Sequence, residues 1–321
     1  GLGRMITRLR LEESRMSNDP WRAGAAWLDG RFMPLAEAKI PVTDWGYRRS
    51  DVTYDVVSVW NGAFFRLDDH LRRFAASMAH FRLQPRETIE EWRGILHELV
   101  RRAGLREAYV AMDCLRAAAP PGLARHPVNA RSYLLAFAVP YVWLMPPEVI
   151  ARGAHLMIAK VRRIPASSVD PRAKNFHWAD MTEALFEASD TGADNPILLD
   201  LDGNVTEGPG FNVFAVNSGK IATPDRGVLE GITRLSVLEL AERLNLPCEV
   251  RPISADELRM ADEVFISSTA GGIIGATRLD GRILGNDRPG PITERLHEAY
   301  WQSRRAGWHA EAVDYTPAAA E

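Results

Sequence analysis

Lys174 is the residue of this sequence whose type and setting best suit covalent chemistry. The chain has 39 basic residues counted as lysine plus arginine, and nearly all of them are arginines. The lysines are confined to four positions, Lys39, Lys160, Lys174 and Lys220. An amine can form a Schiff base with a carbonyl group, whereas a guanidinium stays protonated and cannot. Each lysine in such an arginine-rich chain is therefore a candidate nucleophile.

The neighbours of Lys174 separate it from the other three lysines. It follows the turn Asp170-Pro171 and precedes two aromatic residues, Phe176 and Trp178, at the start of a helical pattern. Aromatic surroundings remove water from an amine and favour its neutral, nucleophilic form. A solvated lysine on a surface loop remains the alternative interpretation.

Two further features suit an anionic, aromatic ligand. Gly231-Ile232-Thr233 stands at a predicted helix start, where free N–H groups and the helix dipole favour a phosphate. Glu207 lies in a glycine-spaced turn that enters an apolar strand, and a carboxylate buried there needs a cationic partner. A protonated pyridine nitrogen is such a partner. An ordinary helix cap and an ordinary turn residue are the alternatives.

The elements around these residues predict an α+β fold. Asp29-Gly30 and Asn61-Gly62 predict tight hairpins, the second joining strands at 52–60 and 63–67. Asp68 and Asp69 are predicted caps of the next helix, and Thr88 begins another that Gly104 stops. Hairpins mixed with helices favour α+β over a doubly wound sheet.

The second half of the chain predicts a larger mixed domain. Strands are expected at 155–161 and 197–200, a helix at 178–189, and a small-residue turn at 269–272. We expect a flexible lead at 1–21, a small domain at 22–140, a linker at 141–149 and the larger domain at 150–321.

Composition excludes several classes of function. The 321 residues are 46% hydrophobic and carry a formal net charge of −3, which gives no support to nucleic-acid or membrane binding. Two cysteines are too few for a disulfide framework, and the eight histidines show no metal-ligand spacing. No secretory signal is evident near the start. We therefore expect a cytoplasmic protein without a metal centre.

Six segments, taken in order, resemble one known family. They are GYRRSDVTYDVVSVWNG, FFRLDDHLRRF, VDPRAKNFHWAD, EGPGFNVF, PDRGVLEGITR and SSTAGG. Together they are similar to the fold-type-IV transaminases, which use pyridoxal 5'-phosphate, and most similar to the (R)-selective amine transaminases. The resemblance implies a small N-terminal α/β domain, a larger pseudo-barrel domain, a cofactor cleft between them and a homodimer.

The resemblance also implies cofactor-binding roles. Lys174 corresponds to the lysine that binds the cofactor as a Schiff base and then moves the proton. Glu207 corresponds to the carboxylate that keeps the pyridine nitrogen protonated, so that the ring accepts electrons. Arg66 corresponds to the phosphate-binding arginine. The other implied cofactor contacts are Leu229 on the ring and Ile232, Thr233 and Thr269 near the phosphate.

Substrate contacts follow from the same resemblance. Alternation along two strands places Tyr54 with Val56, and Tyr109 with Ala111, on shared faces. Arg125 stands where the subgroup has a mobile arginine for the keto-acid carboxylate. The remaining implied substrate residues are Arg49, Trp178 and Ala270.

The favoured function is transfer of an amino group from a primary (R)-amine to a keto acid such as pyruvate. Branched-chain transaminases carry Tyr-x-Arg where this chain has Tyr109-Val110-Ala111, which argues against that subgroup. A D-amino-acid or branched-chain transaminase is nevertheless the first alternative. A lyase of the same fold and a binding protein on an inactive scaffold are the others.

Overall fold

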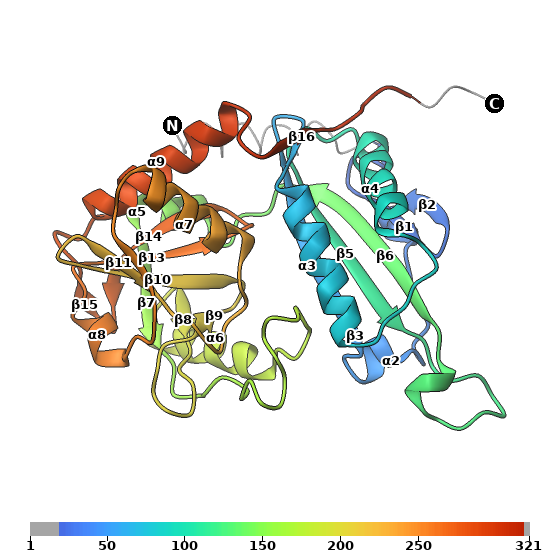
Figure 1. The fold of residues 1–321 in the computed structure, drawn as a ribbon, viewed down its shortest axis with the longest axis horizontal. Helices are drawn as coiled ribbons and strands as arrows, with labels where there is room; N and C mark the ends of the chain where they lie inside the picture. Colours follow the sequence, from blue (N-terminus) through green and yellow to red (C-terminus); the bar gives the residue numbers. More distant parts are fainter. Residues whose placement is uncertain (1–18, 318–321) are drawn as a thin grey trace. The chain divides into compact units, whose positions relative to one another are not determined.

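The computed structural model describes residues 19–317, and it divides them into two compact units of mixed α and β structure (Figure 1). One unit contains the chain up to Val142 together with Ala173–Phe176 and the segment from Trp308 onward. The other contains Trp143–Arg172 and His177–Gly307. The predicted α+β class is confirmed. Most of the lead predicted at 1–21 lies outside the described residues.

Among the described residues, the first unit has a seven-stranded sheet in the order β16-β4-β3-β5-β6-β1-β2. All neighbouring strands in it run antiparallel. Asp29 and Gly30, and likewise Asn61 and Gly62, have positive φ, which confirms both predicted tight hairpins. The strands are β1 (Ala25–Leu28), β2 (Arg31–Pro34), β3 (Val52–Trp60), β4 (Ala63–Phe65), β5 (Ala108–Arg116), β6 (Ser132–Pro140) and β16 (Ala310–Ala312).

Helices α3 (Leu67–His80) and α4 (Ile89–Ala103) cover one face of this sheet, which we call the helix-covered face (Figure 1). Its core joins Val57 and Val59 of β3 to Val110 and Met112 of β5 and to apolar residues of both helices. Because side chains alternate along a strand, the intervening residues point away from the helices. We call the second side the opposite face and define it by Tyr54, Val56, Tyr109, Ala111 and Asp113.

The helix ends follow local chemistry, with one correction. Thr88 and Glu91 form a reciprocal capping box at the start of α4, and Gly104 ends it in the left-handed conformation, as predicted. The prediction for α3 was wrong in detail, because β4 ends at Phe65 and the helix begins at Leu67. Asp68 and Asp69 lie in its first turn, while Arg66 occupies the cap position with φ 57°.

The second unit has a nine-stranded mixed sheet among its described residues, with the main order β12-β11-β10-β13-β14-β7-β8. Strand β7 pairs in parallel with β14 and β8, and β11 with β12. The strands are β7 (Ala154–Ile158), β8 (Asn195–Ile197), β9 (Glu207–Gly208), β10 (Phe211–Asn217), β11 (Lys220–Thr223), β12 (Cys248–Val250), β13 (Glu263–Ser268), β14 (Gly272–Leu279) and β15 (Arg282–Ile283).

The helices of this unit are α5 (Pro147–Arg152), α6 (Ala179–Thr191), α7 (Ile232–Arg243), α8 (Ala255–Arg259) and α9 (Pro291–Arg305). The first unit also contains the short α2 (Trp45–Arg48) and the 3-10 turns η1 (Leu35–Glu37) and η2 (Pro127–Asn129). No helix within residues 19–317 has the length and apolar character needed to cross a membrane.

Two strand predictions in this unit were wrong. The strand expected at 155–161 ends at Ile158, and the one expected at 197–200 is β8, which ends at Ile197. Leu198 leaves the ladder because its backbone bonds to Thr206 and Glu207 instead. Strand β14 was not predicted. Its glycines allow close packing, since a side chain at Gly275 would meet Pro289 at 2.7 Å.

Candidate active site

The Lys174 loop is fixed to the edge of β3. The backbone carbonyl of Lys174 accepts hydrogen bonds from the Thr53 hydroxyl at 2.6 Å and from the Tyr54 N–H at 3.4 Å. Asn175 forms an isolated β-bridge with Thr53. The Lys174 backbone is therefore bonded to β3, although it lies in a loop.

The side chain of Lys174 extends over an aromatic ring. Its Nζ lies 4.5 Å from the centroid of the Tyr54 ring, within cation–π range. Tyr54 also packs on Phe176, with ring centroids 4.5 Å apart. Within the second unit, Trp178 packs against the apolar cluster that contains Met181, and its predicted substrate role stays a prediction. The aromatic setting expected from the sequence is present, but Tyr54 supplies the ring under the amine.

The register of β3 and β5 assembles the predicted substrate residues of the opposite face. Val56 pairs with Ala111, and Tyr54 pairs with Asp113. Val56 and Ala111 are both buried. Burial, with the nearby Tyr54 and Asp113, raises the pKa of Tyr109 to about 12. The prediction that these residues share a face is confirmed. Asp113 was not singled out from the sequence.

Arg66 combines a buried side chain with an unusual backbone. It is 4% exposed, and its left-handed conformation is uncommon for a residue other than glycine. Its Nε donates to Asp69 Oδ2 at 2.7 Å, and its guanidinium lies 5.8 Å from the Trp308 ring. Strained conformations of this kind persist where the surrounding structure enforces them, and they are common at functional sites.

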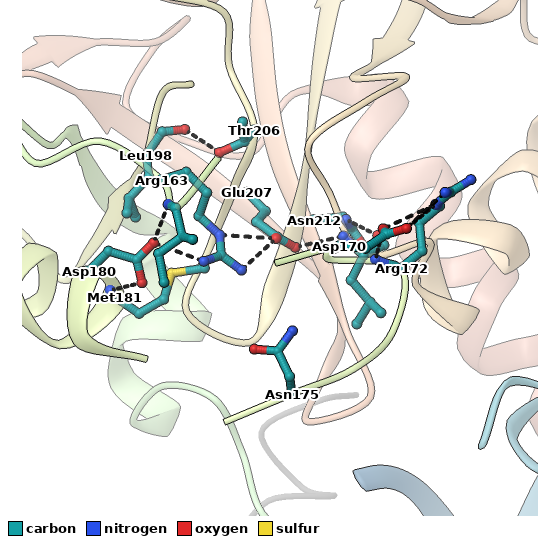
Figure 2. A network of polar contacts seen from close by, with 12 residues as sticks. Arg163, Asp170, Arg172, Asn175, Asp180, Met181, Leu198, Thr206, Glu207 and Asn212 are labelled. Atoms are coloured by element: carbon teal, nitrogen blue, oxygen red, sulfur yellow. Dashed lines mark hydrogen bonds and ion pairs between the residues drawn. The ribbon is translucent and has the colours of Figure 1, made fainter. Parts of the chain in front are cut away.

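Glu207 lies at the centre of a buried polar network (Figure 2). Its Oε1 accepts a hydrogen bond from the Leu229 N–H at 3.0 Å, and its Oε2 accepts from Arg163 Nε and Nη2 at 3.3 and 3.2 Å. Arg163 Nη1 also donates to Asp180 at 2.8 Å. Burial opposes the charge on Arg163, but Glu207 and Asp180 together raise its pKa.

The cation that accompanies Glu207 is thus a residue of the chain itself. Sequence reasoning expected a cationic partner for this carboxylate and missed Arg163. The available signal was the pair Arg162-Arg163 directly after the strand predicted at 155–161, because neighbouring side chains in extended backbone point to opposite sides and one of the two can point inward.

The start of α7 lies next to this network. Asn212 donates to the Leu229 carbonyl at 2.8 Å, which shapes the turn before the helix. Gly231 is required there, because a Cβ would meet Asn212 Oδ1 at 2.2 Å. Ile232 and Thr233 are buried in the first turn, whose N–H groups have no partners inside the helix. This end of α7 is suited to an anion.

The remaining predicted residues have simpler surroundings. Thr269 and Ala270 join β13 to β14, and the Ala270 carbonyl accepts from the Leu144 N–H at 2.7 Å. Arg49 is exposed, with its guanidinium 4.0 Å from the Trp45 ring. Arg125 is exposed on the loop after β5. Among the described residues, neither arginine is bonded to the Lys174 loop. Their predicted substrate roles stay predictions.

Comparison with known proteins is consistent with this chemistry. Residues 53–279 match the model of the amino-transferase class IV family. A D-alanine aminotransferase of Bacillus licheniformis is 31% identical over 86% of this chain and 95% of its own. A branched-chain-amino-acid aminotransferase of Pseudomonas aeruginosa is 29% identical over 90% of this chain and 96% of its own.

A solved structure is similar over almost the same range. It is the branched-chain amino acid aminotransferase of Thermobaculum terrenum in its PLP form, with a TM-score of 0.78 and 28% sequence identity. It covers 88% of this chain and 94% of its own. The chain therefore belongs to the class IV aminotransferases, and it is an enzyme of the transaminase type.

Proposed function

We propose that this enzyme is an amino-acid transaminase of the D-amino-acid or branched-chain type, with a keto acid as acceptor and pyridoxal 5'-phosphate as cofactor. The observation that carries the proposal is the placement of Lys174. Its backbone is fixed to β3, and its amine extends over the Tyr54 ring. The curated relatives compared above favour amino-acid donors over the (R)-amine that the sequence motifs favour.

The residues present fit this cofactor in its chemistry. The start of α7 and the guanidinium of Arg66 suit a phosphate group. Glu207 is a buried carboxylate of the kind that would face a pyridine nitrogen, and Arg163 is its ion-pair partner. When bound, the cofactor supplies an electron sink for the carbanion that forms at the substrate Cα.

The chain's own residues perform the remaining steps. Lys174 would hold the cofactor through its amine, and the same amine, which lies over the Tyr54 ring, would move the proton at the substrate Cα. Because the backbone of Lys174 is bonded to β3, movement is left to its side chain, and this keeps the direction of proton transfer constant. Hydrogen bonds from the Leu229 N–H and from Arg163 hold the carboxylate oxygens of Glu207 in place.

An (R)-selective amine transaminase is the second candidate, favoured by one observation. The opposite face presents the small, apolar pair Val56 and Ala111 together with an acidic residue, Asp113. An apolar substituent fits such a surface better than a carboxylate does. Arg49 and Arg125 are the basic residues of the predicted set that remain available for a keto-acid carboxylate.

A half-reaction distinguishes the candidates. Purified protein is loaded with cofactor, and the visible absorbance of the bound cofactor is followed after addition of D-alanine, L-leucine, (R)-1-phenylethylamine or (S)-1-phenylethylamine. Bleaching by an amino acid, with recovery on adding pyruvate, supports the first proposal. Bleaching by the (R)-amine alone supports the second. Absence of any response to all four donors contradicts both. We also expect a homodimer, which sedimentation measures directly.

A further inference from the structure

Asp113 is a buried acidic residue without a partner. It lies on β5 and is 8% exposed, between its register neighbours Tyr54 on β3 and Leu135 on β6. Among residues 19–317, no side chain or backbone group forms a hydrogen bond or ion pair with its carboxylate. Burying a charge in this way is costly unless a cation or a proton compensates for it.

The pKa of Asp113 also indicates that its carboxylate has no cationic partner. Burial raises the pKa of Asp113 to about 7, and no basic residue opposes that effect. The same carboxylate contributes to the high pKa of Tyr109 on the same face. The charge of the Asp113 carboxylate therefore acts on neighbouring residues, and no group among the described residues neutralises it.

The position of Asp113 connects it to the reacting amine. Its register partner is Tyr54, the residue whose ring lies under the Lys174 amine. The next pair along the strands is Val56 and Ala111, both small and apolar. A molecule that reacts at Lys174 and lies along this face meets an aromatic ring, two small side chains and one carboxylate.

We propose that Asp113 is a specificity-determining residue that binds a second cationic group on the amino donor. The inference rests on the proposed transaminase function and specifies its substrate class. The shared chemistry is an ammonium or guanidinium group separated from the reacting amine by a short carbon chain. Diamines and basic amino acids both carry it. A cation at Asp113 would remove the cost of the unpaired buried charge.

Matched donor pairs test the proposal. Half-reaction rates are compared for 1,4-diaminobutane against butylamine, and for ornithine against norvaline in each enantiomer. In the wild-type protein the cationic member of at least one pair should react about 10-fold to 100-fold faster at limiting concentration. A preference within the first pair identifies diamines, and one within the second identifies basic amino acids. Equal rates within every pair overturn the proposal.

Asp113→Asn replaces the carboxylate with a neutral group of the same shape. We expect it to bring the ratio within each pair to about threefold or less, and Asp113→Ala should act in the same direction. Asp202→Asn, an exposed residue in a turn of the second unit, is the control and should leave every ratio unchanged. A ratio that survives both Asp113 substitutions contradicts the assignment.

A binding measurement separates this inference from the proposed function. Calorimetric titration of the cofactor-free protein with 1,4-diaminobutane should detect binding that Asp113→Asn weakens by about tenfold or more. If no donor bleaches the loaded enzyme but this difference is found, the transaminase proposal fails and the cation site stands. If neutral donors bleach it and the diamine binds both proteins equally, the reverse holds.

Discussion

Two aspartates on neighbouring strands of the same sheet have opposite surroundings. Asp55 on β3 points to the helix-covered face, where Arg73 donates to it through Nε and Nη2, both at 2.8 Å, and His70 Nδ1 lies at 2.8 Å. Asp113 on β5 points to the opposite face and has no such partners within the described residues. Burial raises the pKa of both carboxyls, but Arg73 and His70 more than reverse that effect at Asp55.

The difference shows how one residue type serves structure on one face and recognition on the other. A buried carboxylate that is fully bonded connects β3 to α3 and has no capacity left for a ligand. A buried carboxylate without a partner contributes no stability at neutral pH, and such a group is more common at sites that bind something. Substitutions on each face therefore have distinct expected effects.

The largest effect is expected on the opposite face, at the reacting amine. Lys174→Ala should lower transaminase turnover by on the order of a thousandfold or more, because no other residue replaces the amine. Lys220→Ala, at the exposed first residue of β11, is the matched control and should retain activity. Turnover is measured with the best donor found in the half-reaction. Substantial activity in Lys174→Ala would mean that the lysine has no catalytic role.

On the helix-covered face, Asp55→Asn should lower the free energy of unfolding by about 3–5 kcal/mol. The substitution leaves the buried charge of Arg73 without its counterion. Urea denaturation measures the change. The exposed pair of Asp19 and Arg22 provides the control, since Asp19→Asn should change stability by less than about 0.5 kcal/mol. Equal effects of the two substitutions would refute the contrast between buried and exposed pairs.

A change of pH should affect the two aspartates in opposite directions. Asp113 has a raised pKa, so its contribution to stability is present below the unfolded value and is lost as pH rises towards about 7. Between pH 5 and 8 this loss should amount to about 3 kcal/mol. Asp113→Asn should remove that dependence, as followed by urea denaturation at each pH.

Asp55 behaves in the opposite sense because its pKa is lowered. Its contribution is present above the unfolded value and is lost as pH falls through the folded value, so it does not vary between pH 5 and 8. A pH dependence in this range that persists in Asp113→Asn would mean that another group causes it.

The smallest effect is expected at the edge of the helix-covered face, where Thr88 caps α4. Thr88→Ala should cost about 1 kcal/mol of unfolding free energy, because the Glu91 N–H loses its acceptor. Thr88→Ser retains the hydroxyl and should restore most of the loss. Both are compared by thermal melting. A loss in Thr88→Ser as large as that in Thr88→Ala would show that the hydroxyl is not the cause.

The strongest local signals in the sequence predicted the corresponding elements. Asn61-Gly62 specified its hairpin, and Thr88 and Gly104 specified the two ends of α4. Strand β14 was missed because its glycines and small residues carry no strand pattern of their own. They are extended because β13 and β7 lie on either side and because Tyr300 and Pro289 leave no room for larger side chains.

In the candidate site, too, the sequence identified some features and only the structure revealed others. By itself, the sequence determined which residues have suitable chemistry, since Lys174, Glu207 and the start of α7 are recognisable from residue type and nearby turns. Only the tertiary structure decided which groups neutralise one another, because charge pairing depends on contacts between residues far apart in the chain. It placed Arg163 beside Glu207 and Tyr54 under Lys174, and it left Asp113 unpaired where Asp55 is fully bonded.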